Sequence, residues 1–187
     1  MALRSLKSRL SGFRREERGS VMVEAVITLP LLIWAVGATY EFFEVHRYQS
    51  ARDKASYTVA DMVSREMLAI TPTYLDNAKT VFDTIASDNG QNAMRVSVIK
   101  YDSNDDEYSV KWSHVRGTPL LEALKTDDVR TAHDRLPVMR NGEELIIVDS
   151  LSSYPPLFDI WVGDDINVST NVMAIPRFAP QINWSNS

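Results

Sequence analysis

The sequence predicts an α+β protein in which a long N-terminal helix precedes a small domain with an antiparallel sheet. Three observations support this prediction. The apolar segment at residues 20–40 is long enough for one transmembrane helix. Apolar side chains then recur at helical spacing up to residue 70. Beyond residue 90 the period of the pattern changes to two, which is typical of strands.

Length, composition and charge narrow the class of protein. The chain has 187 residues, no cysteine and a net charge of −5, so disulfides and thiolate chemistry are excluded. Residues 1–19 carry six basic and two acidic side chains, a net charge of +4, which leaves −9 for the remainder. The acidic remainder does not favour nucleic-acid binding. A basic leader beside an apolar segment is expected to stay in the cytoplasm.

The segment at residues 20–40 is the predicted transmembrane helix. Glu24 is the only charged residue among the 22 residues between Arg18 and Glu41. As a helix, residues 20–40 rise about 32 Å, which matches a hydrocarbon core of about 30 Å. A carboxylate is disfavoured in hydrocarbon, so we expect Glu24 to have a functional partner. Pro30 lacks an amide proton and is predicted to kink the helix.

A glycine stands directly before this segment, at Gly19. Cleavage after Gly19 would make Ser20 the amino terminus and create a cation that complements Glu24. A basic leader, Gly-x₄-Glu and an apolar span in this order resemble the type IV prepilin processing site. The resemblance implies removal of residues 1–19 by prepilin peptidase. It also implies pairing of Glu24 in one subunit with the Ser20 amine of another.

Two other interpretations of the N-terminal region remain open. A secretory signal peptide would also have a basic start and an apolar core, and Ala35-Val36-Gly37 fits a small-x-small cleavage site. An uncut single-pass anchor would keep the leader and present an envelope interaction module. Glu24 within the apolar core, and the helical pattern beyond Tyr40, favour retention of the segment over its removal.

The helical pattern continues outside the apolar segment. Residues 41–70 form the predicted amphipathic continuation, because no proline or glycine interrupts the pattern between Ala38 and Ile70. Thr71 and Pro72 then predict the N-cap and first residue of a second helix, which closes near Asn89-Gly90.

The exported domain is predicted to span residues 71–176 and to contain about four strands. Alternating residues at 94–99 and 107–113 flank a polar turn and predict a hairpin. Residues 143–151 and 166–175 predict two further strands. Other expectations concern the connections: a short helical segment at 118–125, a further turn at 128–136, a departure from the sheet at 152–158, and a C-terminal arm at 177–187.

No constellation in the sequence predicts an enzyme, a catalytic residue, a cofactor or a small-molecule substrate. Asp102, Asn104 and Asp106 begin like a calcium loop, but the glycine and glutamate of an EF-hand are missing at their positions. The histidines lack metal-ligand spacing, so no metal site is expected. They are His46, His114 and His133. Four aromatic residues near the C-terminus could close a core or form a partner-binding surface, and we expect the role in a core. They are Tyr154, Phe158, Trp161 and Trp184.

The layout of the whole chain resembles the TadE-like and TadF-like pseudopilins of the tight-adherence (Tad/Flp) pilus system. The matching segments are Arg18-Gly19-Ser20-Val21, Val23-Glu24 and Leu29-Pro30-Leu31-Leu32. The resemblance implies a minor pilin that acts in assembly of an adhesive pilus. It implies membrane lipid, other Tad pilins and the inner-membrane assembly platform as partners. It also implies a cytoplasmic N-terminus in the bacterial inner membrane, and an exported domain that is periplasmic or incorporated in the pilus.

Overall fold

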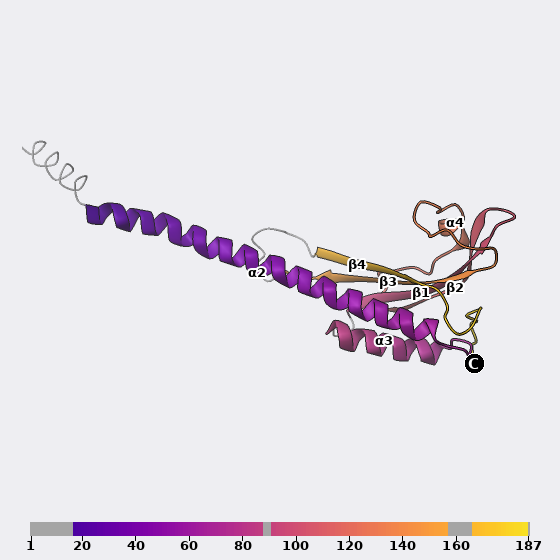
Figure 1. Cartoon of the computed structure of the whole chain (residues 1–187). Coiled ribbons are helices and arrows are strands. Elements are labelled where there is room, and N and C mark those ends of the chain that lie inside the picture. Colours follow the sequence, from indigo (N-terminus) through magenta and orange to yellow (C-terminus); the bar gives the residue numbers. More distant parts are fainter. Residues whose placement is uncertain (1–16, 88–90, 157–165, 187) are drawn as a thin grey trace, which may run out of the picture. The chain divides into compact units, whose positions relative to one another are not determined.

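Figure 1 shows a computed structural model that describes residues 17–87, 91–156 and 166–186, with side chains from residue 21 onward. The predicted α+β class is confirmed, because a long apolar helix precedes a four-stranded antiparallel sheet with short helices. The chain divides into two compact units, Met1–Glu44 and Val45–Ser187. The second unit therefore includes the last part of the long helix, whereas the sequence placed the start of the domain at residue 71.

Helix α2 (Glu17–Ser64) contains the apolar segment and ends six residues before the predicted limit at residue 70. Two sets of hydrogen bonds account for the earlier end. The carbonyl oxygen of Ser64 accepts from the amide of Arg177 at 2.8 Å. Glu66 Oε1 accepts from the amides of Met67 and Leu68 at 3.1 and 3.2 Å. These bonds satisfy backbone groups that a continuing helix would otherwise use.

Helix α3 (Pro72–Ala86) begins where the sequence predicts. Thr71 Oγ1 accepts from the amide of Tyr74 at 3.2 Å, and Pro72 occupies the first turn, where its missing amide proton costs nothing. Ser87 ends the helix in the left-handed conformation, with φ of 53°. The apolar stripe of the helix is buried and consists of Leu75, Ala78, Phe82 and Ala86.

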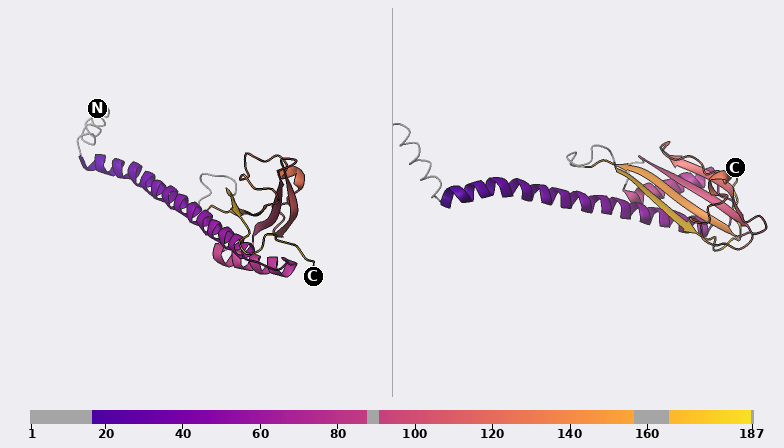
Figure 2. Two further views of the ribbon diagram at one scale, coloured as in Figure 1. Left: turned by 45° about the vertical axis from the view of Figure 1, so that its right-hand side comes forward. Right: turned by 90° about the horizontal axis from the view of Figure 1, so that it is seen from above.

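The sheet has the order β2-β1-β3-β4, and every pair of neighbours is antiparallel (Figure 2). Its strands are β1 (Asn92–Asp102), β2 (Glu107–Gly117), β3 (Glu144–Tyr154) and β4 (Ile166–Ala174). The predicted hairpin joins β1 and β2. Strand β3 continues to Tyr154, so residues 152–154 remain in the sheet and the chain leaves it only at Pro155.

Two cores lie on opposite faces of the sheet. Helices α2 and α3 cover one face, and the segment between β2 and β3 covers the other (Figure 1). The helix-side core includes Val59 and Val63 of α2, Phe82 of α3, and Val96 and Val148 of the sheet. The smaller loop-side core consists of Ile99, Tyr108, Val129, Ala132, Leu136, Met139, Leu145 and Ile147.

A bulge in β2 moves its apolar side chains from one face to the other. Val98 pairs with Trp112 and Ile99 pairs with Val110, so Lys111 is an extra residue on β2. Tyr108 therefore packs in the loop-side core and Trp112 in the helix-side core. The simple alternation read from the sequence places these two side chains on one face, which is wrong because the bulge shifts the period.

The connection between β2 and β3 is less helical than predicted. Residues 118–125 are irregular, and α4 (Thr126–Val129) is a single helical turn. The reason is that this segment accepts hydrogen bonds from backbone amides at the edge of β2. The Val110 amide donates to Thr126 Oγ1 at 3.1 Å, and the Tyr108 amide donates to the Arg130 carbonyl oxygen at 3.1 Å.

The predicted C-terminal arm is packed on the domain over its described residues, Arg177–Asn186, which we call the C-terminal strap. Ile182 is 1% exposed. Its amide donates to Glu144 Oε2 at 2.7 Å, and its carbonyl oxygen accepts from Trp112 Nε1 at 2.9 Å. Ile70 exchanges backbone hydrogen bonds with the residues on either side of Trp184. Long-range contacts, absent from any local pattern, hold the strap in place.

Candidate functional site in the N-terminal half of helix α2

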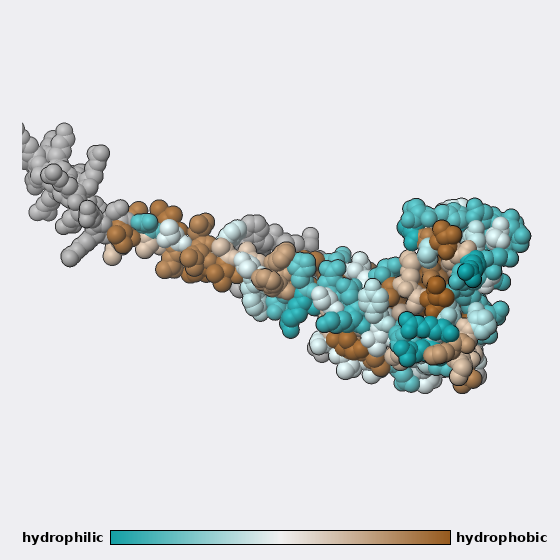
Figure 3. All heavy atoms as spheres, viewed as in Figure 1, coloured by the Kyte–Doolittle hydropathy of each residue, from teal (hydrophilic) through white to brown (hydrophobic). Residues whose placement is uncertain are grey.

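The N-terminal half of α2 exposes its apolar side chains. From Val21 to Val36 the large apolar residues are between 43% (Trp34) and 73% (Met22) exposed. Figure 3 shows this part of α2 as a largely apolar surface, interrupted by hydrophilic atoms near its start. The described residues include one helix long and apolar enough to cross a membrane. Because exposed apolar surface of this extent is unfavourable in water, the segment requires lipid or other helices around it.

Glu24 lies on this exposed helix. Gly19 and Ser20 precede it in the first turns of α2, where the backbone is helical. Thr28 Oγ1 donates to the backbone oxygen of Glu24 at 2.8 Å. No hydrogen bond or ion pair within the described part of the chain involves the Glu24 carboxylate. The carboxylate is exposed and available to a group from outside the chain. The pairing of Glu24 with a Ser20 amine remains a prediction.

Pro30 lies within α2, and the helix continues on both sides of it. The proline removes the hydrogen bond that its amide would donate to the preceding turn. The threonines on either side, Thr28 and Thr39, donate from their hydroxyls to the carbonyl oxygens of Glu24 and Ala35, at 2.8 and 2.7 Å. Side-chain hydrogen bonds of this kind are associated with helix bending. The predicted kink at Pro30 remains a prediction.

The other residues singled out in the sequence do not gather in one site, although Asp106 and His133 are neighbours. Asp102, Asn104 and Asp106 are in or beside the β1–β2 turn, where Asp102 Oδ1 accepts from the Asn104 amide at 2.9 Å. His114 stacks on Trp184, with ring centroids 3.6 Å apart. His133 Nε2 lies 3.1 Å from the Asp106 carbonyl oxygen. Within the described ranges, no group of histidine and acidic side chains could hold a metal ion.

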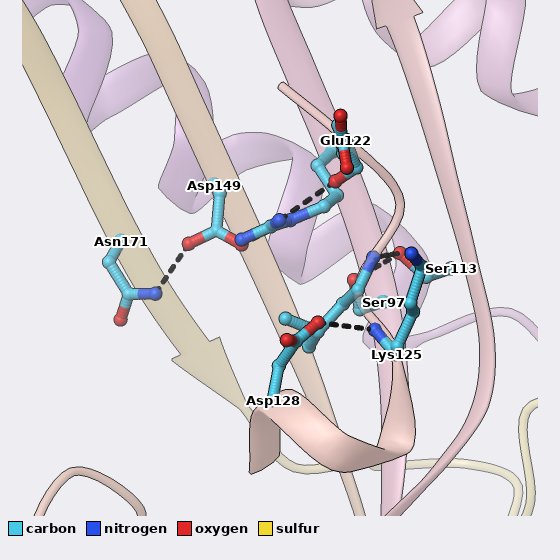
Figure 4. A network of polar contacts seen from close by, with 9 residues as sticks. Ser97, Ser113, Glu122, Lys125, Asp128, Asp149 and Asn171 are labelled. Carbon is cyan, nitrogen blue, oxygen red and sulfur yellow. Dashed lines mark hydrogen bonds and ion pairs between the residues drawn. The ribbon is translucent and has the colours of Figure 1, made fainter.

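A polar cluster on the loop-side face joins three strands (Figure 4). Arg95 donates from Nε and Nη2 to Asp149 Oδ2 at 2.9 and 2.8 Å, and from Nη1 to the Glu122 carbonyl oxygen at 2.8 Å. Asn171 Nδ2 donates to Asp149 Oδ1 at 2.5 Å. Both oxygens of Asp149 are thus engaged within the protein. The cluster binds β1, β3, β4 and the covering segment together.

The aromatic residues near the C-terminus fall into two groups. Tyr154 is buried and packs edge-to-face on Tyr48 of α2, with ring centroids 4.9 Å apart. Trp184 packs against the helix-side core, and the centroid of its ring lies 5.6 Å from that of Trp112. For these two, the expected role in a core is confirmed. Phe158 and Trp161 lie outside the described residues.

Arg52 is a buried residue that the sequence analysis did not identify. It is 0% exposed, and its Nε donates to Ser152 Oγ at 2.6 Å. Its guanidinium carbon lies 3.0 Å from the centroid of the Tyr48 ring, and Nη1 donates to the Tyr48 carbonyl oxygen at 3.2 Å. The sequence does indicate that Arg52 faces the domain. Tyr48, Arg52 and Ser56 recur at a spacing of four, on the same helix as Ala55 and Val59.

Comparison with protein-family models, curated proteins and solved structures finds no match for this chain.

Proposed function

We propose that the protein is a minor pilin, or pseudopilin, that acts in assembly of a Tad-type adhesive pilus. The observation that carries the proposal is the order of features at the N-terminus. A basic leader, Gly19, and Glu24 at the fifth position after it precede an apolar helix whose side chains are exposed in the structure. A sheet domain follows on the same chain, as in the layout of TadE-like and TadF-like pseudopilins.

Glu24 has the central role in this proposal. Cleavage after Gly19 removes the basic leader and leaves the Ser20 amine at the start of the apolar helix. In lipid, the Glu24 carboxylate of one subunit then pairs with the Ser20 amine of a neighbour, because each charge alone is disfavoured in hydrocarbon. The exposed carboxylate of the single chain supports this role.

The proposed location follows from the charge and the helix. The basic leader remains in the cytoplasm, the apolar part of α2 spans the inner membrane, and the sheet domain lies in the periplasm or in the pilus. The partners are the prepilin peptidase, other Tad pilins, the inner-membrane assembly platform and membrane lipid.

The native amino terminus tests the proposal directly. Mass spectrometry of the protein purified from its own cells is expected to find Ser20 as the first residue. A terminus at Ala38 would instead indicate a secretory signal peptide. An intact, arginine-rich leader on the functioning protein would contradict the pilin proposal.

The second candidate is an uncleaved, single-pass membrane protein whose sheet domain binds an envelope partner. The exposed apolar helix favours this candidate equally, because it requires only an anchor. Purification from membrane extracts distinguishes the two. A pseudopilin is expected to co-purify with pilus proteins and lack residues 1–19, whereas an anchored module keeps its leader and is recovered without them.

A further inference from the structure

We propose that Lys79 of α3 and Asn92 of β1 become joined by an amide bond between Lys79 Nζ and Asn92 Cγ, and that Asp83 transfers the protons of this reaction. The inference concerns the sheet domain and does not depend on processing at Gly19. The reaction requires an amine, an amide and a carboxylate that are held in contact away from water. The structure brings these three groups together from α3 and β1.

A single carboxylate oxygen contacts both nitrogens that the reaction exchanges. Asp83 Oδ1 accepts from Lys79 Nζ at 2.7 Å and from Asn92 Nδ2 at 2.9 Å. Asp83 Oδ2 also accepts from Lys79 Nζ, at 2.6 Å. Because both nitrogens are within hydrogen-bond distance of the same carboxylate, protons can pass between each nitrogen and Asp83 directly.

The amine and the amide are buried. Lys79 is 8% and Asn92 0% exposed, and the side chain of Asp83 is 24% exposed. Burial disfavours charges, and transfer of one proton from Lys79 Nζ to Asp83 removes both charges and leaves a nucleophilic amine. Asn92 Oδ1 is buried without a hydrogen-bond partner among the described residues. Structural hydrogen bonding therefore accounts for only one end of the Asn92 amide.

Gly117, the last residue of β2, leaves room for Lys79 beside Asn92. It pairs with Ala93 of β1 and has φ of 98°. A β-carbon at this position would overlap the Asn92 carbonyl oxygen and lie 2.9 Å from Lys79 Cε. The last methylene group of the lysine thus packs on the glycine, next to the backbone of Asn92. This contact and the ion pair with Asp83 hold the amine near the amide.

The reaction replaces one amide nitrogen with another and releases ammonia. Asp83 takes a proton from Lys79 Nζ, and the electron pair of Nζ attacks Asn92 Cγ while the carbonyl electrons move to Oδ1. Asp83 then donates its proton to Nδ2 and accepts a second proton from Nζ. The carbonyl bond forms again as the bond between Cγ and Nδ2 breaks, and Nδ2 leaves as ammonia. The balance needs no other reactant. The product fastens α3 to the first residue of β1.

The polar cluster on the loop-side face has a similar arrangement but cannot react in this way. There Asp149 accepts from both Arg95 and Asn171 (Figure 4). The guanidinium group of arginine stays protonated in proteins and is not a nucleophile. Asn171 is therefore expected to keep its amide, and it serves as an internal control for the loss of ammonia at Asn92.

Peptide mass spectrometry of the full chain, purified in detergent, tests the proposal. A protease that cleaves before aspartate cuts the chain before residues 76, 83, 88 and 102, which separates residues 76–82 from residues 88–101. The amide bond is expected to hold these two peptides together as a branched pair. Its mass should be lower than the sum of the two by one ammonia, about 17 Da. Recovery of the two as separate, unmodified peptides overturns the proposal.

The branched product distinguishes this reaction from another loss of ammonia in the same region. Asn89-Gly90 can cyclise to a succinimide, which lowers the mass by the same amount. A succinimide leaves residues 76–82 unlinked. A loss of ammonia that is confined to residues 88–101, without a branched pair, would therefore overturn the proposal.

Matched variants test the role of each side chain. Lys79→Arg keeps a cation beside Asp83 and removes the nucleophile, so no branched pair is expected and the circular dichroism spectrum should match that of the parent chain. Lys100→Arg, at an exposed position of β1, is the control and should form the branched pair as the parent does.

Asp83→Asn keeps the size of the side chain and removes the proton acceptor. The branched fraction is expected to fall more than about tenfold. A branched pair in Lys79→Arg overturns the proposal. An unchanged branched fraction in Asp83→Asn overturns the role of Asp83 in proton transfer.

Discussion

Arg52 places a permanent positive charge where no side-chain surface is exposed. Its hydrogen bond to Ser152 attaches α2 to β3, and its guanidinium also contacts the ring of Tyr48, one turn earlier on α2. One turn further along α2, Ser56 Oγ lies 2.7 Å from Thr170 Oγ1 of β4. Polar contacts at one side chain per turn therefore accompany the apolar packing between α2 and the sheet.

We expect Arg52→Ala to destabilise the sheet domain strongly. The change removes the cation–π contact and leaves Ser152 Oγ buried without its donor, at a cost of about 2–4 kcal/mol. For a chain of this size the melting temperature should fall by about 5–15 °C. Thermal unfolding, monitored by circular dichroism, measures the melting temperature. Lys54→Ala, at an exposed position two residues away, is the control and should change stability little. Equal melting temperatures of the two variants would refute the role of Arg52.

Glu24→Ala is expected to separate processing from assembly. The carboxylate has no role in breaking the peptide bond after Gly19, so cleavage should continue. Loss of the carboxylate leaves the amine of a neighbouring subunit without its partner in lipid, and incorporation into pili should fall about tenfold. Immunoblots of sheared pili and of membranes measure both quantities. Normal piliation with Glu24→Ala would contradict the pairing.

His114 makes the stability of the domain depend on pH. Burial, and secondly the nearby Arg116 cation, lower the pKa of His114 below its ordinary value of 6.5. The unfolded chain therefore binds more protons at this site than the folded chain as the pH falls below about 6.5. The stability that neutral His114 contributes is present above that pH and is lost as the pH falls towards the lower, folded pKa.

A His114→Phe variant tests this dependence. Phenylalanine can stack on Trp184 and does not titrate. The loss of melting temperature between pH 7 and pH 5 should therefore be smaller than in the parent chain. His133→Phe is the control, because it replaces a histidine on the other face of the sheet, where His133 packs beside Tyr108. Parallel pH profiles for the parent and His114→Phe would exclude the proposed contribution.

At the scale of elements, the C-terminal strap and the bulge of β2 act together. Lys111, the extra residue of the bulge, donates to Glu144 Oε1 at 2.6 Å, while Glu144 Oε2 accepts from the Ile182 amide. Trp112, beside the bulge, donates to the Ile182 carbonyl oxygen. Two consecutive side chains of β2 at the bulge are thus linked to the strap, Trp112 directly and Lys111 through the buried Glu144.

We expect Ile182→Ala to loosen the strap. Ile182 is 1% exposed, so truncation should cost about 2–4 kcal/mol through lost burial and a cavity. Ile175→Ala removes the same atoms at a position that is 55% exposed and should change stability by less than about 0.5 kcal/mol. Urea unfolding measures both, and hydrogen exchange should show faster exchange at Ile70, whose amide donates to Asn183. An effect of Ile182→Ala no larger than that of Ile175→Ala would mean that the strap does not stabilise the domain.

At the scale of the whole molecule, the distribution of charge sets the expected orientation. The leader carries +4 and the remainder −9, and the apolar segment separates them. Changing Arg14, Arg15 and Arg18 to Glu reverses the charge beside the apolar segment. We expect this variant to insert poorly or in the opposite orientation.

Protease treatment of spheroplasts measures the orientation. The sheet domain of the parent chain should be digested from outside, and that of the charge-reversed variant should be protected. Charge reversal at Arg130, Arg135 and Arg140, about 90 or more residues after the apolar segment in the sequence, is the control and should leave the domain accessible. Equal accessibility of the domain in all three proteins would show that the leader does not set the orientation.

Much of the fold could be predicted because it depends on local patterns. The start of α3 follows from Thr71 and Pro72, whose capping geometry involves neighbouring residues alone. Strands β1, β2 and β4 follow from alternating patterns at residues 94–99, 107–113 and 166–175, and β3 follows from an apolar run at residues 143–151. The apolar helix, the basic leader and the spacing of Gly19 and Glu24 are likewise properties of contiguous sequence. They are the basis of the proposed function.

Other features were decided by the tertiary structure, because they depend on contacts between distant segments. The burial of Arg52 requires Ser152, which lies 100 residues further along the chain. The packed conformation of the strap requires hydrogen bonds to the side chains of Trp112 and Glu144. The position of β4 at one end of the sheet is defined only by the strand order. A local pattern states which side chains can be buried, but the free energy of burying a charge or ordering a terminus depends on the partner that the fold brings to it.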